Sequence, residues 1–178
     1  PQSIERGRGS HPSDRVGKNF VMKWRNPLIV PSRSFTGLQG KLLGASLRSA
    51  VDISVSTGLG GATILDWDTE NFARPGSHSL TLNPSRIIIP FTGKWLVLIR
   101  VLFATDTTGT VRRVYLVTNG ANNGADTRPP PSGHQAVGEM FAVKSFAKDD
   151  YLQVSAEHNA TGTLLVTPQD FTVMFMSV

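Results

Sequence analysis

Apolar and polar side chains alternate along most of this chain with the period of two that is typical of β-strands. In residues 151–157, for example, every second side chain is apolar, namely Leu152, Val154 and Ala156. Other short segments of strand character are bounded by Gly, Pro, Asn or Asp: 51–55, 86–89, 95–103, 111–118, 141–144, 163–166 and 171–178. No long segment repeats with a helical period of 3.6 residues. The pattern predicts an all-β sandwich or barrel.

Turn residues separate the predicted strands. Asn119-Gly120 is a strong signal for a tight β-hairpin. Gly58-Leu59-Gly60-Gly61 predicts a turn, and residues 122–134, which contain three consecutive prolines, predict a loop.

Two predicted strands are apolar on both faces. Because such a strand is usually covered on both sides, we expect 95–103 to be central. The strand at 171–178 must also be covered twice, once by its own sandwich and once by a neighbouring subunit. We assign the subunit contact to Phe171, Val173 and Phe175, while Thr172, Met174, Met176 and Val178 face the other way. The alternative is an ordinary core strand of a monomer.

The net charge of +5 lies entirely in the first fifth of the chain. Residues 1–35 hold seven basic and two acidic side chains, whereas residues 36–178 hold eleven of each. Pro27 and Pro31 prevent a helix there, so we expect an extended basic arm at 1–35 that precedes a folded domain at 36–178.

The second half of the arm is too apolar for a solvated tail. We therefore expect it to dock onto a neighbouring protein through basic and apolar side chains: Arg6, Arg8, Arg15, Lys18, Phe20, Lys23, Trp24, Arg25, Leu28 and Ile29. The alternatives are packing on its own domain and a disordered basic tail. We do not expect nucleic-acid binding, since only Lys23-Trp24-Arg25 interleaves basic and aromatic residues.

Candidate chemistry is sparse. There is no cysteine, no apolar run long enough for a membrane helix and no recognisable signal peptide, so we expect neither membrane insertion nor thiol chemistry. The four histidines, His11, His78, His134 and His158, are far apart, and we expect them in surface loops. Asp66, Asp68 and Glu70 alternate and could hold a cation, but a full calcium-binding spacing is absent, so solvent exposure or an ion pair is the simpler interpretation. We expect no enzyme activity, catalytic residue, metal or cofactor.

Several segments resemble a known module. They are DWDTENF at 66–72, NPSRIIIPFTGKWLV at 83–97, VYLVTNG at 114–120, KDDYLQV at 148–154 and the closing 171–175. Together they are similar to the trimeric jelly roll shared by complement globular heads and tumour necrosis factor, in the version common in bacteriophage virion proteins. The resemblance covers roughly residues 45–178. Trp95 stands where that family favours Tyr, and Lys148 where it favours Gly.

The resemblance implies a jelly-roll β-sandwich that forms a homotrimer, and hence a structural virion protein fastened by its arm to tail or major capsid protein. We favour a minor tail protein involved in host attachment, with host cell-surface glycan as a further partner, over a capsid decoration protein. A secreted cytokine-like ligand and a carbohydrate-active enzyme are the other classes. The enzyme is disfavoured because 3 Trp and 2 Tyr do not suffice for an aromatic-lined groove.

Overall fold

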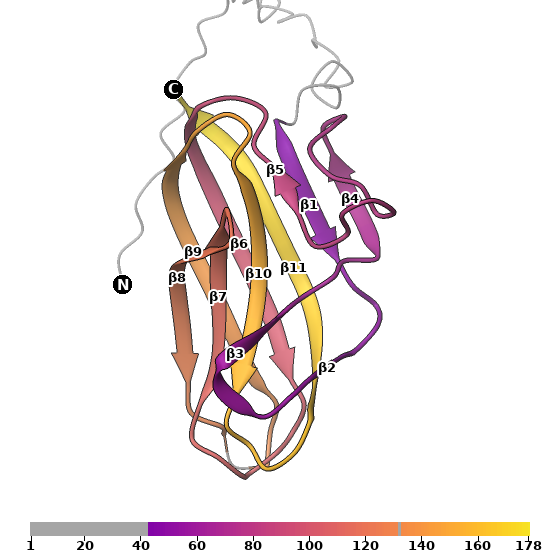
Figure 1. Cartoon of the computed structure of the whole chain (residues 1–178), viewed down its shortest axis with the longest axis vertical. Coiled ribbons are helices and arrows are strands. Elements are labelled where there is room, and N and C mark those ends of the chain that lie inside the picture. Colours follow the sequence, from indigo (N-terminus) through magenta and orange to yellow (C-terminus); the bar gives the residue numbers. More distant parts are fainter. Residues whose placement is uncertain (1–42, 132) are drawn as a thin grey trace, which may run out of the picture. The chain divides into compact units, whose positions relative to one another are not determined.

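The computed structural model describes residues 43–131 and 133–178, which fold into eleven β-strands without a helix (Figure 1). The chain divides into the units Pro1–Phe35 and Thr36–Val178, and the strands belong to the second unit. All paired strands are antiparallel and lie in two sheets, so the expected all-β sandwich is confirmed.

Sheet A has the strand order β4-β1-β11-β6-β9. β2 also pairs with β11, at residues 164–166, whereas β1 pairs with residues 171–174. Its strands are β1 (Gly44–Arg48), β2 (Ile53–Val55), β4 (Thr69–Ala73), β6 (Gly93–Phe103), β9 (Ala136–Phe146) and β11 (Leu164–Ser177). The long strands β6, β9 and β11 lie next to one another, and β6 is central, as its apolar sequence predicts.

Sheet B has the order β3-β10-β7-β8, with β5 paired to β10. Its strands are β3 (Gly58–Ile64), β5 (Ile87–Ile88), β7 (Arg112–Thr118), β8 (Ala121–Arg128) and β10 (Tyr151–His158). Consecutive strands repeatedly change sheet, which is the connectivity of a jelly roll.

The core lies between the sheets and follows from the period-two pattern. On β6, alternate side chains from Trp95 to Phe103 are buried, and β10 contributes Leu152, Val154 and Ala156. Trp67 packs against Phe171, with ring centroids 5.5 Å apart. Each large buried side chain stabilises the fold by about 1.5–3 kcal/mol.

The Asn119-Gly120 turn joins β7 to β8, as predicted. Both residues have positive φ values, 51° and 82°, as a primed hairpin turn requires. The Asn119 side chain donates to Asp150 (2.7 Å) and accepts from the Tyr151 N–H (3.0 Å), which fixes the turn to the start of β10.

Two segments predicted to be irregular are strands. The expected loop at 122–134 begins with β8, whose Asn, Gly and Asp residues have low strand propensity. The tight turn returns the chain directly onto β7, and the backbone pairing outweighs propensity. The expected turn at 58–61 is likewise the start of β3, which pairs with β10.

The two strands predicted at 163–166 and 171–178 are one strand, β11, interrupted by a β-bulge between Pro168 and Asp170. Proline has no N–H for the ladder and is tolerated at a bulge. The residues between the two predicted strands are therefore not a loop, and they only shift the register within one continuous strand.

The assignment of Phe171 and Val173 to a subunit contact is wrong. Both side chains are fully buried in the core of their own sandwich. Phe175 is partly buried and packs against Phe91 and Trp95, at centroid distances of 4.7 and 5.3 Å. The sequence correctly places Phe171, Val173 and Phe175 on one face of β11, but this face points into the core and not toward a neighbouring subunit.

Candidate functional site

The outer face of sheet A is unusually apolar for an uncovered surface. Phe141 and Val143 on β9 are 73% and 53% exposed, and Met176 and Leu165 on β11 are also exposed. Leu96, Leu98 and Leu102 on β6 and Met174 on β11 are half-buried. Contiguous apolar surface of this kind usually marks an interaction site.

The strand register arranges these side chains in rows across β9, β6 and β11. One row consists of Val143, Leu96 and Met174, and the next of Phe141, Leu98 and Thr172. A further row, beyond a charged one, consists of Val137, Leu102 and Thr167. We call these residues and the charged row between them the β6 face.

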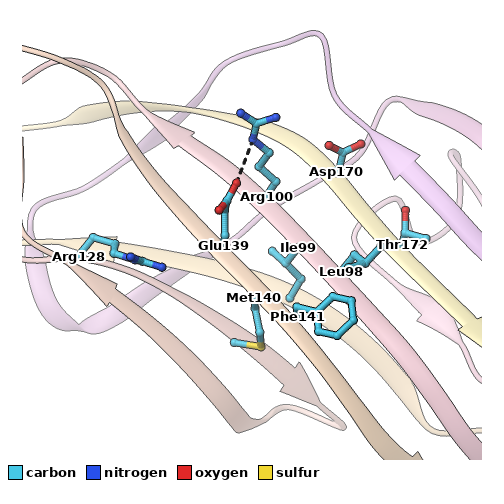
Figure 2. Close-up of a pocket in the computed structure, with 9 residues that line it drawn as sticks. All are labelled: Leu98, Ile99, Arg100, Arg128, Glu139, Met140, Phe141, Asp170 and Thr172. Carbon is cyan, nitrogen blue, oxygen red and sulfur yellow. Dashed lines mark ion pairs between the residues drawn. The ribbon is translucent and has the colours of Figure 1, made fainter.

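The charged row consists of Glu139, Arg100 and Asp170. Arg100 Nε lies 3.4 Å from Glu139 Oε1, and both side chains are about half exposed. Figure 2 shows this pair together with Asp170 on the neighbouring strand. The row crosses a shallow groove of about 640 Å³ that is also lined by Leu98, Phe141 and Thr172.

The bulge in β11 determines that Asp170 belongs to this row. Pro168 pairs with Val101 and Asp170 with Arg100, so that Gln169 is the extra residue. Without it, the alternation would turn position 170 toward the core. A bulge re-aims side chains in this way.

Toward β1 the β6 face becomes polar. The Thr172 hydroxyl donates to Ser46 Oγ (2.7 Å), which also accepts from the Asn71 amide (3.2 Å). These bonds satisfy the polar groups within one copy and mark where the apolar surface ends.

The alternating acids at 66–70 do not form a cluster. Asp68 accepts bonds from the Thr69 and Ser49 hydroxyls and the Ala50 N–H; the Thr69 bond has the largest effect and lowers the pKa of Asp68. Glu70 instead contacts His78 Nδ1 at 2.6 Å. Within residues 43–131 and 133–178, no three His, Asp or Glu side chains come together as a metal site.

A second pocket, of about 410 Å³, lies beside these acids. It is lined by Asp66, Asp68, Ser49, Val51, Ile53, Trp67, Leu80 and Pro84. The Trp67 indole N–H is buried without a hydrogen-bond partner among the described residues. Within the pocket lining, the Ser49 hydroxyl donates to Asp68 Oδ2 at 3.2 Å.

A buried ionic network crosses sheet B. Glu157 is almost fully buried and accepts hydrogen bonds from Arg113 (2.7 Å), the Tyr115 hydroxyl (2.7 Å) and the Gly60 N–H (2.9 Å). Burial acts to raise the pKa of Glu157, but the three donors and the Arg113 charge outweigh it, and the pKa is lowered. The network attaches β3 to β7 and β10 and is structural.

The expectation that the histidines lie in surface loops is wrong for His158, and His78 lies in the loop between β4 and β5 but is not exposed there. His78 has no exposed side-chain surface and contacts Glu70 and the Pro84 carbonyl. His158, on β10, accepts from the Ala160 N–H at Nδ1 and therefore donates from Nε2 to the Val55 carbonyl. Both rings fasten loops, while His134 is exposed and His11 lies outside the described residues.

The predicted docking residues of the arm also lie outside the described residues, and the structure does not test them. They are Arg6, Arg8, Arg15, Lys18, Phe20, Lys23, Trp24, Arg25, Leu28 and Ile29. In the part of the chain that the structure describes, no helix is long and apolar enough to cross a membrane.

The β6 face was not predicted from the sequence, although two of its strands were predicted to be apolar on both faces. The residues 95–103 and 171–178 are apolar on both faces, and we expected β6 to be covered on both sides. In one copy, its outer face is only half covered. The contribution of β9, with Phe141 and Val143, follows from strand neighbours that only the structure provides.

No protein-family model matches the chain, and no curated protein matches it in sequence. Solved structures match it in fold. The globular domain of zebrafish complement 1qA protein has a TM-score of 0.55 at 7% identity, covering 76% of this chain and 98% of that one. Eiger TNF from S. frugiperda has a TM-score of 0.55 at 12% identity, covering 76% and 93%. Murine APRIL at pH 5.0 has a TM-score of 0.52 at 19% identity, covering 76% and 100%.

These matches confirm the predicted jelly-roll fold of the complement and tumour necrosis factor type. At such low identity, the likeness concerns the fold alone.

Proposed function

We propose that this chain is a homotrimeric structural protein whose copies associate through the β6 face. The observation that carries the proposal is the exposure of Phe141 and Val143 beside the leucines of β6, on the outer face of the three longest strands. The likeness to complement and tumour necrosis factor folds supports a trimer, because the family resemblance implies packing of three copies around an axis through apolar strand faces.

Burial of this face would favour association. Phe141, Val143 and Met174 each contribute up to about 1.5–3 kcal/mol when fully buried, before the cost of ordering is subtracted. Three equivalent interfaces in a closed ring add up, which favours a trimer over isolated pairs.

The proposed biological role is that of a bacteriophage virion component, a minor tail protein for host attachment or a capsid decoration protein. It is supported by the sequence resemblance to phage jelly rolls and by the separation of charge, since residues 1–35 carry the whole net charge. In this proposal the basic arm binds tail or major capsid protein, and the jelly roll is displayed on the virion surface.

A secreted cytokine-like ligand is the second candidate. The likeness to APRIL and to Eiger TNF favours it. Mass spectrometry of purified phage particles from the source of the chain separates the two: the virion role predicts the chain in washed particles at a fixed stoichiometry, and absence from them would favour the ligand.

The trimer is tested by a charge on the β6 face. In sedimentation experiments, Phe141→Asp should give a folded monomer, because association would bury an unpaired carboxylate. Leu82→Asp is the matched control, since Leu82 is 81% exposed and outside sheet A, and it should remain trimeric. A Phe141→Asp variant that assembles as the unmodified chain does would contradict the assignment of the interface.

A further inference from the structure

The charged row of Glu139, Arg100 and Asp170 crosses the β6 face between apolar rows. On one side lie Phe141 and Leu98, and on the other Val137 and Leu102. If the face is buried, as the proposed function requires, the row is buried with it. Buried charges must be paired, because an unpaired one is strongly destabilising.

Not every charged group of the row has a partner within one copy. The row holds one guanidinium and two carboxylates. Arg100 uses its Nε for Glu139, and its terminal nitrogens have no partner among the described residues. Asp170 likewise has no hydrogen bond or ion pair with any residue of the described part. In Figure 2 the terminal nitrogens of Arg100 extend beyond Glu139, and Asp170 lies apart from the pair.

We propose that Arg100 of each copy pairs with Asp170 of the next copy, so that the three charged rows form one closed set of ion pairs. This inference rests on the proposed trimer. In a rotationally symmetric ring, each contact joins two different parts of the surface. The Arg100–Glu139 pair occupies β6 and β9, and Asp170 lies on the opposite side, on β11. Asp170 is the direct ladder neighbour of Arg100 in its own copy, yet the two make no ion pair there, so each can pair with the other residue of the next copy.

Arg128 lines the same groove but is a poorer partner for Asp170. Its Nε is bound to both carboxylate oxygens of Asp126, at 2.9 and 3.1 Å, on the edge strand β8. Figure 2 places its guanidinium away from Arg100 and Asp170. Arg128 is about half exposed, as Arg100 is, so it provides a matched control.

The proposed pairing would set the register of the assembly. Apolar rows slide over one another at small cost, whereas a shifted charged row would leave carboxylates buried and unpaired. The row thus makes the β6 face specific for another copy of itself. The bulge at Gln169 is required, because it turns Asp170 toward the face.

A double-mutant cycle tests the proposal on the full chain. Arg100→Gln, Asp170→Asn and the double variant are compared with the unmodified chain by sedimentation equilibrium over a dilution series. Each single variant should raise the midpoint concentration of trimer dissociation by about tenfold or more, because it leaves one buried charge without its partner. The double variant should be no weaker than the weaker single one. Circular dichroism confirms that each variant is folded.

The same cycle with Arg128→Gln is the control and should be additive with Asp170→Asn. Additive effects of Arg100→Gln and Asp170→Asn, or coupling to Arg128 instead, would overturn the pairing while the trimer itself stands. An unmodified chain that is monomeric at every concentration would refute the proposed function, and the two failures are therefore distinguishable.

Discussion

At the scale of single residues, several polar groups that hold strands and loops in place have specific partners. Glu157, with three donors, and Asp68, with hydroxyl and N–H donors, are held as anions by hydrogen bonds. Arg112 is buried and donates to the carbonyls of Val111, Asp106 and Thr108, which fastens the β6–β7 loop. These residues explain how loops are attached to a sandwich that has no disulfide.

Glu157 makes stability depend on pH. Its pKa in the folded protein is lowered, so its contribution is complete above the ordinary carboxyl value, near 4.5, and is lost as the pH falls through the folded pKa. We expect Glu157→Gln to lower the free energy of unfolding at pH 7 by about 1–3 kcal/mol. The variant should also lose less of its free energy of unfolding than the unmodified chain as the pH falls from about 5 to about 2. Urea unfolding at several pH values measures both effects.

The control for Glu157 is Asp149→Asn, because Asp149 is 75% exposed and its ion pair, with Lys148, is exposed as well. It should change the free energy of unfolding of the isolated copy by less than about 0.5 kcal/mol. An unchanged pH profile in Glu157→Gln would show that the network contributes no pH-dependent stability.

At the scale of elements, β1 illustrates how close backbone packing limits the sequence. Gly44 pairs with Met174 on β11 and has a φ of 150°. A Cβ at this position would lie only 1.9 Å from the Val173 carbonyl oxygen. The contact is with backbone, so it cannot be relieved by a side-chain rotation.

Gly44→Ala should therefore separate β1 from β11 locally and lower the free energy of unfolding by about 2–3 kcal/mol. Gly61→Ala, on β3, is the control, since a Cβ there meets nothing within 4 Å. Thermal unfolding of both variants measures the difference. Equal melting temperatures for the two would refute the close packing of β1 against β11.

The strands could be predicted from the sequence where side chains alternate or where a turn is encoded. The alternation at 151–157 identified β10, and the Asn119-Gly120 turn identified the end of β7. β8 could not be predicted, because its residues favour turns and only pairing with β7 makes it a strand.

The face of β11 could not be derived from the sequence either. Alternation separates Phe171 from Thr172 but does not say which of them points inward. That depends on the neighbouring strands β1 and β6 and on the bulge at Gln169. The double apolar character of 171–178 predicts a second contact, and the residues that face outward are Thr172, Met174 and Met176.

At the scale of the whole molecule, we assign the association of copies and the attachment to a larger particle to different parts of the chain. The charges of residues 36–178 sum to zero, and the whole net charge of +5 lies in residues 1–35. A neutral jelly roll with an apolar face suits self-association, whereas a basic and apolar segment suits docking to another protein.

Deletion of residues 1–35 should leave the trimer intact and abolish incorporation into particles. Trp24→Ala should weaken incorporation more than Arg6→Ala, because a buried aromatic side chain contributes about 1.5–3 kcal/mol while an exposed ion pair contributes about 0–1 kcal/mol. Quantitative immunoblotting of purified particles measures occupancy. Full occupancy without the arm would show that the jelly roll itself is the anchor.

The mass of the unmodified full chain in solution tests the central claim most directly. Sedimentation equilibrium at micromolar concentrations and neutral pH should give three times the chain mass of 19.3 kDa. The trimer should dissociate only on strong dilution. A mass of one chain throughout the concentration range would contradict the account, because the β6 face would then remain exposed to water.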